Sequence, residues 1–445
     1  MTVSFRTIRD VAERQLCCGC GVCAYLSPDE IEMVDTRDYG RRPLLREGAP
    51  RDRRSGEAMR ACPGIRLEHT FDPEDPALIP ELTTGWGPVR EIWEGYAADP
   101  EIRFAGSSGG AASALALFCI ERLGFHGFLH IAARPDLPYL NHTVLSTTRA
   151  EIFAATGSRY APASPCDRLQ MIEDAPGPCA FIGKPCDVAG LQAARRLRPE
   201  LDRKVGLTIA IFCAGTPTTR ATLALLARMG VSDPASVISL RYRGNGWPGN
   251  AAVRFRTPAG IAERELTYAQ SWGEVLTNDK QWRCNLCPDH TGEFADIAVG
   301  DPWYREIPQG EPGRSLVLAR TERGQRILRT ALAAGYLSLA RAAPAILPAS
   351  QPNLLQARGA VWGRILALRV VGLPTPARLS GVTFKLWWKH LSIRARIRSL
   401  VGTLRRVIGR ALWRRHPVTA MHVENARTCP QTPEAVEPGV VTLHG

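Results

Sequence analysis

The middle of the chain repeats one pattern of hydrophobic and polar positions. A short apolar stretch is followed by a turn and then by a helix-length stretch of about twelve residues. The pattern recurs at 91–124, 179–197, 207–230 and 316–335. Strands that alternate with helices in this way predict an α/β domain over 81–345, built on a mixed, largely parallel sheet.

Both ends of the chain differ from this middle region. Residues 1–80 are loop-rich, carry clustered cysteines and end in the linker "FDPEDPALIP", so we expect a small separate module there. Residues 346–416 form a basic extension. Its apolar positions 393, 397, 400, 404, 407 and 411 recur at steps of four and three, which predicts an amphipathic helix within 384–415. Residues 417–445 are expected to be a disordered tail.

The positive charge of the protein is regional. The net charge is +13, but no Asp or Glu occurs between Glu322 and Glu424, a stretch with eighteen Lys and Arg. Without those eighteen charges the remainder carries −5. Two interpretations of the basic helix stay open: a helix lying on an anionic membrane surface, and a solvated helix packed partly on the core. Nucleic acid is disfavoured as a partner because no recognition motif accompanies the charge.

The cysteine content favours a reducing compartment. The chain has 13 cysteines, an odd number, and no apolar stretch follows its first residues. The longest apolar run, at 111–120, is about half of the roughly 20 residues that a spanning helix needs. We therefore expect a cytoplasmic protein that crosses no membrane, and a membrane-peripheral one if the basic helix binds lipid.

The segment "LCCGCGVCAYLSP" contains a cysteine motif typical of iron–sulfur proteins. Cys17, Cys20 and Cys23 form C-x2-C-x2-C with glycines between them, and a short glycine-bearing loop can wrap three thiolates around one cluster. Cys62, followed by proline, supplies a fourth thiolate, and Cys18 is left over or replaces Cys17. Structural zinc is the alternative, although zinc sites usually pair two C-x2-C knuckles.

A second set of thiols follows from the predicted sheet. Cys186 and Cys213 each come directly after an apolar strand, and the carboxyl ends of parallel strands share one edge. Cys284 and Cys287 add a C-x2-C pair in "RCNLCPDH". Together these residues form a second candidate four-thiolate site. The alternative is that Cys186 and Cys213 are ordinary buried cysteines.

A glycine-rich turn precedes the helix predicted after residue 110. "AGSSGG" places Ser107, Ser108, Gly109 and Gly110 where free N–H groups and the helix dipole favour a phosphate. The turn is neither G-x-G-x-x-G nor a Walker loop, so a plain helix cap is an equal alternative.

In combination these segments resemble the β-subunit family of coenzyme F420-reducing hydrogenases and F420-linked dehydrogenases, which includes 7-hydroxymethyl chlorophyll a reductase-like proteins. The resemblance covers about residues 10–340. It is carried, in chain order, by "CCGCGVC", "CPG", "GSSGGAASAL", "GSRYAPASP", "FIGKPCDVAGL", "IFCAGTP", "WRCNLCPDH" and "ADIAVGDPW". The distant Cys62 and the basic extension depart from what this family leads us to expect.

The resemblance implies a flavin-binding domain, an iron–sulfur module at the N-terminus, FAD and one or two [4Fe-4S] clusters. The clusters would be held by Cys17, Cys20, Cys23 and Cys62, and by Cys186, Cys213, Cys284 and Cys287. FAD would lie near Gly106, Ser107, Ser108, Gly109 and Gly110, with Ser158, Tyr160 and Lys184 as further candidates.

The resulting hypothesis is an oxidoreductase that passes electrons from F420H2 or reduced ferredoxin through the clusters and FAD to an organic substrate. One alternative is an electron-relay subunit of a larger dehydrogenase or hydrogenase. The other is a membrane-surface reductase in polysaccharide or isoprenoid metabolism. A homo-oligomer or a larger redox complex is expected. No residue is assigned as catalytic, and His126 and Asp301 are candidates for a proton donor.

Overall fold

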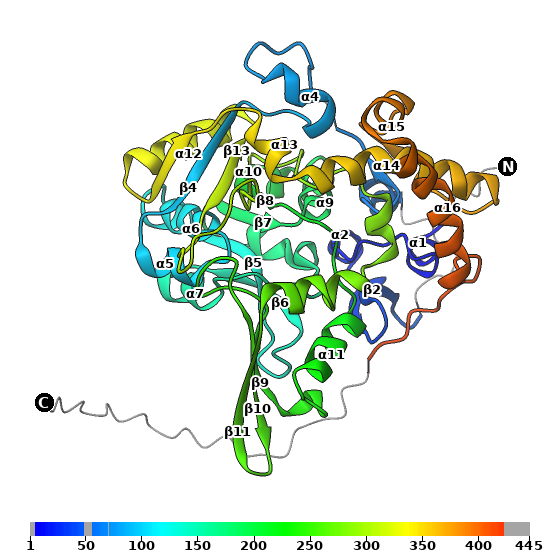
Figure 1. Cartoon of the computed structure of the whole chain (residues 1–445), viewed down its shortest axis with the longest axis horizontal. Coiled ribbons are helices and arrows are strands. Elements are labelled where there is room, and N and C mark those ends of the chain that lie inside the picture. The colour runs from blue at the N-terminus through cyan, green and yellow to red at the C-terminus, as the bar shows by residue number, and fades with distance from the viewer. Residues whose placement is uncertain (1–4, 49–55, 70, 422–445) are drawn as a thin grey trace, which may run out of the picture.

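The computed structural model describes residues 5–48, 56–69 and 71–421, and its centre is an eight-stranded sheet (Figure 1). The strand order is β14-β4-β13-β12-β8-β7-β5-β6. The strands are β4 (Glu91–Ala97), β5 (Gly127–Ala133), β6 (Asn141–Ser146), β7 (Cys179–Gly183), β8 (Val205–Ile211), β12 (Ile297–Gly300), β13 (Ser315–Ala319) and β14 (Leu337–Arg341).

The centre of this sheet is parallel and its edges are antiparallel. Strands β12, β8, β7 and β5 run in one direction. Strands β13 and β6 run against their neighbours β12 and β5, and β14 and β13 both run against β4. The predicted mixed, largely parallel sheet is therefore confirmed.

Helices cover both faces of the sheet, which explains why its central strands β7, β12 and β13 are almost continuously apolar. On β7, Cys179 and Phe181 pack on one face while Ala180 packs on the other, as the two-residue period of a strand requires. The face of Ala180 is covered by α5 (Pro100–Ala105), α6 (Ala111–Glu121), α7 (Arg149–Ala154) and α12 (Glu322–Ala333). The face of Phe181 is covered by α4 (Pro80–Trp86), α8 (Gln170–Glu173), α9 (Pro185–Arg195), α10 (Pro199–Lys204) and α13 (Ile346–Ser350).

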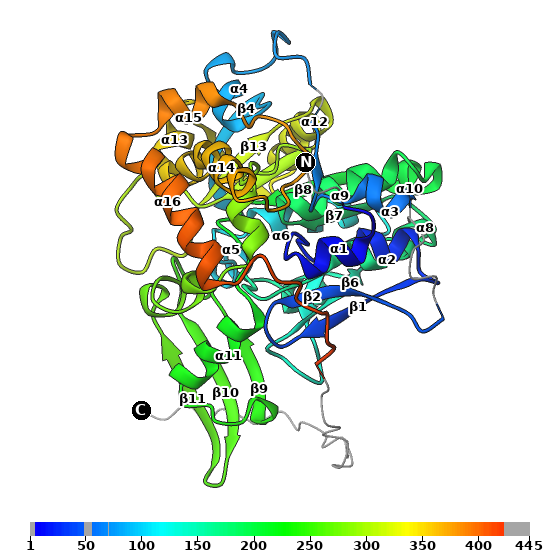
Figure 2. The same cartoon turned by 90° about the vertical axis from the view of Figure 1, so that its right-hand side faces the viewer.

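The two ends of the chain pack together, although they are far apart in sequence (Figure 2). The N-terminal part contains α1 (Ile8–Glu13), α2 (Val22–Leu26), β1 (Ile31–Thr36), β2 (Gly40–Leu45), α3 (Gly56–Ala61) and β3 (Arg66–Leu67). The C-terminal part contains α14 (Pro352–Val370), β15 (Arg378–Leu379), α15 (Phe384–His390) and α16 (Ile393–Gly409). Strand β15 pairs with β3, and Val361 and Val407 share an apolar cluster with Val11 and Leu16.

The basic segment expected to form one helix contains two. Leu391 and Ser392 separate α15 from α16, and the Ser392 hydroxyl accepts a hydrogen bond from the Ala395 N–H at the new helix start. The predicted apolar row does not face the core as a unit, because Val407 is buried while Ile393 and Ile397 are exposed. Of the predicted tail, residues 422–445 lie outside the described part.

A smaller sheet projects from the main body below the large one (Figure 1). It consists of β9 (Val237–Arg241), β10 (Ala251–Thr257) and β11 (Gly260–Leu266), all antiparallel, and α11 (Thr219–Arg228) packs against it. Across the described ranges, none of the helices has the length and apolar content that a membrane span requires.

Candidate functional site

Five cysteines line one small pocket at the carboxyl ends of β7 and β8: Cys18, Cys186, Cys213, Cys284 and Cys287. Cys186 lies in the first turn of α9, directly after β7, and Cys213 comes two residues after β8. Because β7 and β8 are parallel, both thiols reach the same edge of the sheet, as the strand pattern predicted.

Cys284 and Cys287 come from the 3-10 turn at Trp282–Leu286 and the residue after it. The Cys284 sulfur accepts a hydrogen bond from the Thr216 N–H at 3.3 Å, and burial raises the pKa of Cys213 to about 11. The structure thus brings all four residues of the second predicted set to one place.

The first predicted set, Cys17, Cys20, Cys23 and Cys62, is buried beside this pocket. Burial, followed by the neighbouring Cys17 and Cys62 thiols, raises the pKa of Cys23 well above its usual value. Cys62 follows α3 directly, so the long stretch of chain between Cys23 and Cys62 folds back to the same loop.

Glycine is required for the shape of this cysteine loop. Gly19 and Gly21 have φ of +76° and +91°, a left-handed conformation that other residues rarely adopt. A Cβ at Gly21 would also lie 2.7 Å from the Asp167 backbone nitrogen. The two glycines between the cysteines therefore let the loop turn and allow close contact with the main domain.

Cys18 is not a spare residue at the surface but lies between the two sets. Its thiol lies beside the thiols of Cys186 of the second set and Cys20 of the first. These two neighbouring thiols lower the pKa of Cys18 well below its usual value. Cys18 is the point at which the two groups of thiols touch.

Arg283 connects the two sets through the backbone. Its guanidinium donates hydrogen bonds from Nε to the Gly64 carbonyl at 2.8 Å and from Nη2 to the Pro63 carbonyl at 2.9 Å. Arg283 is buried and immediately precedes Cys284, whereas Pro63 immediately follows Cys62. These two hydrogen bonds join the turn that carries Cys284 to the turn that follows Cys62.

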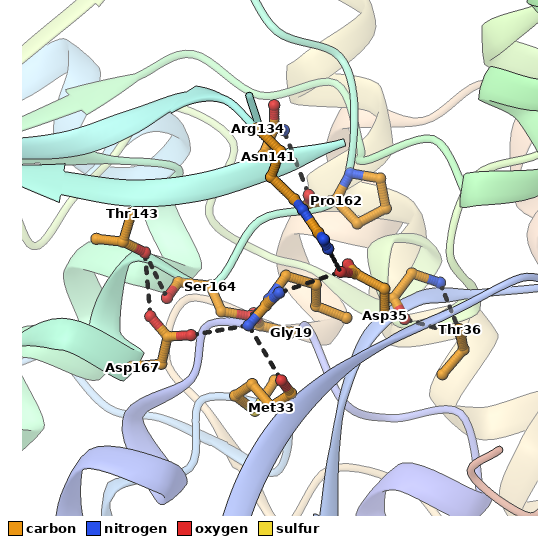
Figure 3. A network of polar contacts seen from close by, with 12 residues as sticks. Gly19, Met33, Asp35, Thr36, Arg134, Asn141, Thr143, Pro162, Ser164 and Asp167 are labelled. Atoms are coloured by element: carbon orange, nitrogen blue, oxygen red, sulfur yellow. Dashed lines mark hydrogen bonds and ion pairs between the residues drawn. The ribbon is translucent and has the colours of Figure 1, made fainter. Parts of the chain in front are cut away.

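A polar network holds the cysteine loop against the main domain (Figure 3). Ser164 donates a hydrogen bond to the Gly19 carbonyl at 2.6 Å. Arg41 binds Asp35 at 3.3 Å and Asp167 at 2.9 Å, which ties β2 to β1 and to the segment after Ser164. The position of the first thiol set relative to the sheet is fixed by these bonds.

The described cysteines are all free, so none of these thiols is used in a disulfide. Among the described residues, no three His, Cys, Asp or Glu side chains are arranged to hold a single metal ion. Ligands of a multi-iron cluster bind separate irons and need not converge on one point.

A larger cavity of about 240 Å³ lies on the other side of the same sheet edge. Seven of the eight predicted cofactor-binding residues line it: Gly106, Ser107, Ser108, Gly110, Ser158, Tyr160 and Lys184. Gly109 does not; a Cβ there would lie 2.9 Å from the Arg314 backbone, so this glycine permits a close chain approach. The segments 106–110, 158–160 and 184 meet here although they are distant in sequence.

Two residues that line the cavity, Arg243 and Asp301, form a buried ion pair. Arg243 binds Asp301 through Nη1 at 3.0 Å and Nη2 at 2.5 Å, and Asp301 accepts a further bond from Ser108 Oγ at 2.8 Å. Asp301 raises the pKa of Arg243 against the lowering effect of burial, so the guanidinium stays charged. The rings of Tyr268 and Trp303 lie 5.0 and 5.2 Å from the same guanidinium.

The cavity and the thiol pocket share the ends of β7 and β8. Lys184 lines the cavity while Cys186, two residues on, lines the thiol pocket. After β8, Phe212 lines the cavity and the next residue, Cys213, lines the thiol pocket. Residues adjacent in sequence at these two strand ends therefore line the two spaces.

Two family models match the chain, and both describe the same protein, "Coenzyme F420 hydrogenase/dehydrogenase, beta subunit". The model of its N-terminal part matches residues 92–170, and the model of its C-terminal part matches residues 178–345. The chain belongs to the coenzyme F420 hydrogenase/dehydrogenase β-subunit family. It is therefore an electron-transfer oxidoreductase subunit. The matched residues contain the whole second thiol set and the cavity; the first set and helices α14–α16 lie outside them.

No curated protein matches the chain. A solved structure of the F420-reducing [NiFe] hydrogenase complex from Methanosarcina barkeri, derivatised with xenon, contains a similar chain at 20% identity and a TM-score of 0.49. The similarity covers 65% of this chain and 94% of that one.

Three cavity residues of this F420-family chain were missed or left undecided from the sequence. Arg243 and His130 were not singled out, and Asp301 was only a candidate proton donor; all three line the cavity. The available signal was that Asp301 directly follows β12 and Arg243 closely follows β9. His126 precedes β5 and therefore lies at the opposite, amino end of the parallel strands.

Proposed function

We propose that this chain is an iron–sulfur flavoprotein oxidoreductase that moves electrons between a low-potential carrier, F420H2 or reduced ferredoxin, and an organic substrate. The observation that carries the proposal is the shared boundary of the thiol pocket and the cavity at Lys184–Cys186 and at Phe212–Cys213. A cluster held by thiols on one side would be separated from a flavin on the other by only a few atoms.

The thiol donors fit iron–sulfur clusters. The two sets provide eight predicted ligands, together with Cys18 at their contact. Thiolates need nearby positive charge when they are buried. Burial raises the pKa of Cys287 and Arg283 opposes this rise, while at Cys18 the neighbouring thiols lower the pKa and Arg283 adds to this lowering. Cys17, Cys20, Cys23 and Cys62 would hold one [4Fe-4S] cluster, and Cys186, Cys213, Cys284 and Cys287 a second.

The cavity is the place where we propose that FAD binds. The free N–H groups of the first turn of α6, at residues 111–113, line this cavity next to Ser107 and Ser108, and such groups suit a phosphate. Lys184 bonds Asp187 at 2.6 Å, and although burial lowers the pKa of Lys184, Asp187 raises it overall. FAD bound here would supply the conversion between single electrons and a hydride pair, next to a lysine that remains charged.

A second candidate function is that of a relay subunit within a larger redox complex. It is favoured by the family description, which names a β subunit. The two functions differ in whether the chain alone turns over a substrate. Oxidation of F420H2, or reduction of an acceptor by reduced ferredoxin, by the isolated chain would contradict the relay function.

The cofactor content tests the proposal directly. Anaerobically purified protein is expected to be brown, to release FAD on denaturation and to contain about eight iron atoms per chain if both clusters are present. Iron, acid-labile sulfide and flavin are measured on the same sample. A colourless protein that contains zinc and no flavin would contradict it.

Arg243 and Asp301 test the flavin assignment within the cavity. Arg243→Gln leaves Asp301 without its guanidinium partner, and Ser108 then loses a fixed acceptor. We expect FAD affinity to fall at least about tenfold, a difference of about 1.4 kcal/mol. Quenching of flavin fluorescence measures the affinity, and circular dichroism checks the fold.

Asp301→Asn keeps the shape of the carboxylate and serves as the conservative variant. Arg256→Gln, on the exposed face of β10, is the matched control and should leave FAD affinity unchanged. Unchanged affinity in both cavity variants would place the flavin elsewhere.

A further inference from the structure

Helix α16 buries two small polar residues and leaves four large apolar residues exposed. Ser399, Thr403 and Val407 face α14 and are buried. The exposed fractions of four apolar residues are 70% for Ile393, 55% for Ile397, 44% for Val401 and 70% for Ile408. A helix packed on a core for stability alone would show the reverse orientation.

The inward orientation is fixed by a close approach of α14. A Cβ at Gly363 would lie 2.2 Å from Ser399 Oγ and 2.6 Å from Trp387 Nε1. Trp387 Nε1 donates to Ser399 Oγ at 3.0 Å, and Thr403 Oγ1 donates to the Ser399 carbonyl at 2.7 Å. Rotation of α16 to bury its isoleucines would break the Trp387–Ser399 bond, and it would remove Ser399 from its close contact with Gly363. The Thr403 bond lies within α16 and holds the Ser399 turn in place.

The exposed apolar residues form one stripe. Ile393, Ile397 and Val401 are four residues apart, and Ile408 follows seven residues after Val401, so all lie on one side of the helix. On α15, Phe384 and Trp388 are also exposed, at 50% and 55%, and the Arg396 guanidinium lies over the Trp388 ring at 4.3 Å. Both helices lie at the outer edge of the molecule in two perpendicular views (Figures 1 and 2).

Arginines border this stripe. Arg394, Arg398 and Arg405 are spaced four and seven residues apart, so they lie along one edge of it. All three are exposed, and none forms an ion pair with a described residue. With no Asp or Glu between Glu322 and Glu424, no acidic side chain in this segment neutralises them.

We propose that the outward surface of α15 and α16 binds an anionic lipid bilayer, with the helix axis of α16 lying in the membrane surface. The isoleucines and Trp388 enter the boundary between headgroups and acyl chains, and the three arginines contact lipid phosphates. The charge of the border matches an anionic surface, and the apolar stripe matches the acyl boundary. This inference goes beyond the proposed redox function and does not depend on it.

Vesicle flotation with the full chain tests the proposal. Two vesicle preparations are compared, phosphatidylcholine alone and phosphatidylcholine mixed with phosphatidylglycerol. The protein is expected to float with the mixed vesicles only, and added salt should reduce binding because arginine–phosphate attraction is screened. Equal binding to both preparations, or to neither, would overturn the proposal.

Two groups of variants separate the apolar and charged contributions. The Ile393→Ser, Ile397→Ser, Val401→Ser variant removes apolar insertion, and the Arg394→Gln, Arg398→Gln, Arg405→Gln variant removes the charges. Each is expected to lower the partition coefficient at least about tenfold. All six side chains are exposed, so the fold should be preserved.

Ile261→Ser is the matched control, because Ile261 is 63% exposed on β11 and far from α16 in sequence. It should bind vesicles like the unaltered protein. Light scattering without lipid measures the oligomeric state, and so tests whether a second copy of the chain binds to this surface instead of lipid. A dimer that dissociates in the Ile393→Ser, Ile397→Ser, Val401→Ser variant would show that a second copy covers the stripe, and would overturn the lipid assignment.

Discussion

The two sets of thiols reach the same region by different means. Three of the four cysteines of the first set come from the short segment 17–23, on a loop that glycines bend sharply. The second set comes from three separate places, the ends of β7 and β8 and the turn after Trp282. The first arrangement is largely local, whereas the second exists only when the sheet has formed.

This difference predicts different sensitivities. A local loop keeps its shape if distant contacts weaken, but a set assembled by strand order depends on every element between its members. The two sets meet at two residues. Arg283 joins them through hydrogen bonds to backbone carbonyls, and Cys18 joins them through contacts between thiols. Substitutions at these points show whether the sets act independently.

The largest effect is expected when a ligand of one set is removed. Cys62→Ala should lose the iron of the first site, about half of the total, and Cys287→Ala the iron of the second. Iron analysis measures how much iron each variant retains. Electron paramagnetic resonance of the reduced protein then identifies which of the two iron–sulfur sites is still occupied. Cys119→Ala, in the apolar core of α6, is the matched control and should retain all iron. If either ligand variant loses all iron, the two sets are one interdependent site.

A smaller effect is expected at Arg283. Arg283→Gln leaves the buried Pro63 and Gly64 carbonyls without partners, and each unpaired buried group costs about 1–3 kcal/mol. The free energy of unfolding, measured by denaturant titration, should fall by about 1–3 kcal/mol for each unpaired carbonyl. The electron paramagnetic resonance signals of both iron sites should also change. Arg283→Lys retains the charge but cannot bind both carbonyls, because it lacks the planar guanidinium.

Arg256→Gln, which is exposed on β10, is the control for this measurement. A change in only one iron signal would mean that Arg283 supports that site alone, and that the backbone does not couple the two sets.

Much of this architecture could be predicted from the sequence. The apolar strands ending at Gly183 and Ile211 indicated the edge where Cys186 and Cys213 meet, because strand ends in a parallel sheet share one side. The glycine-rich turn before α6 was singled out from a local pattern alone, with a plain helix cap as an equal alternative to a phosphate site. Only the second thiol set was located by a local pattern combined with a topological rule.

Other features could not be predicted because they depend on contacts between distant segments. Arg243 becomes part of the cavity only through its pair with Asp301, fifty-eight positions along the chain. The periodicity of α16 predicted an apolar stripe but could not tell which face meets α14, since that orientation depends on Gly363 and Trp387. Cys18 appeared dispensable because its contact with Cys186 joins two segments that are far apart in the sequence.

The smallest effect is expected at Cys18, and it most directly tests whether the two sets communicate. Cys18→Ala should retain the iron of both sites, because four other thiols remain for each. Both paramagnetic resonance signals should shift, since the Cys18 side chain contacts Cys20 and Cys186. Cys17→Ala is the matched comparison at the adjacent position and should lose the iron of the first site. Loss of iron in Cys18→Ala with retention in Cys17→Ala would instead make Cys18 the ligand, and the first set would then extend directly into the pocket of the second.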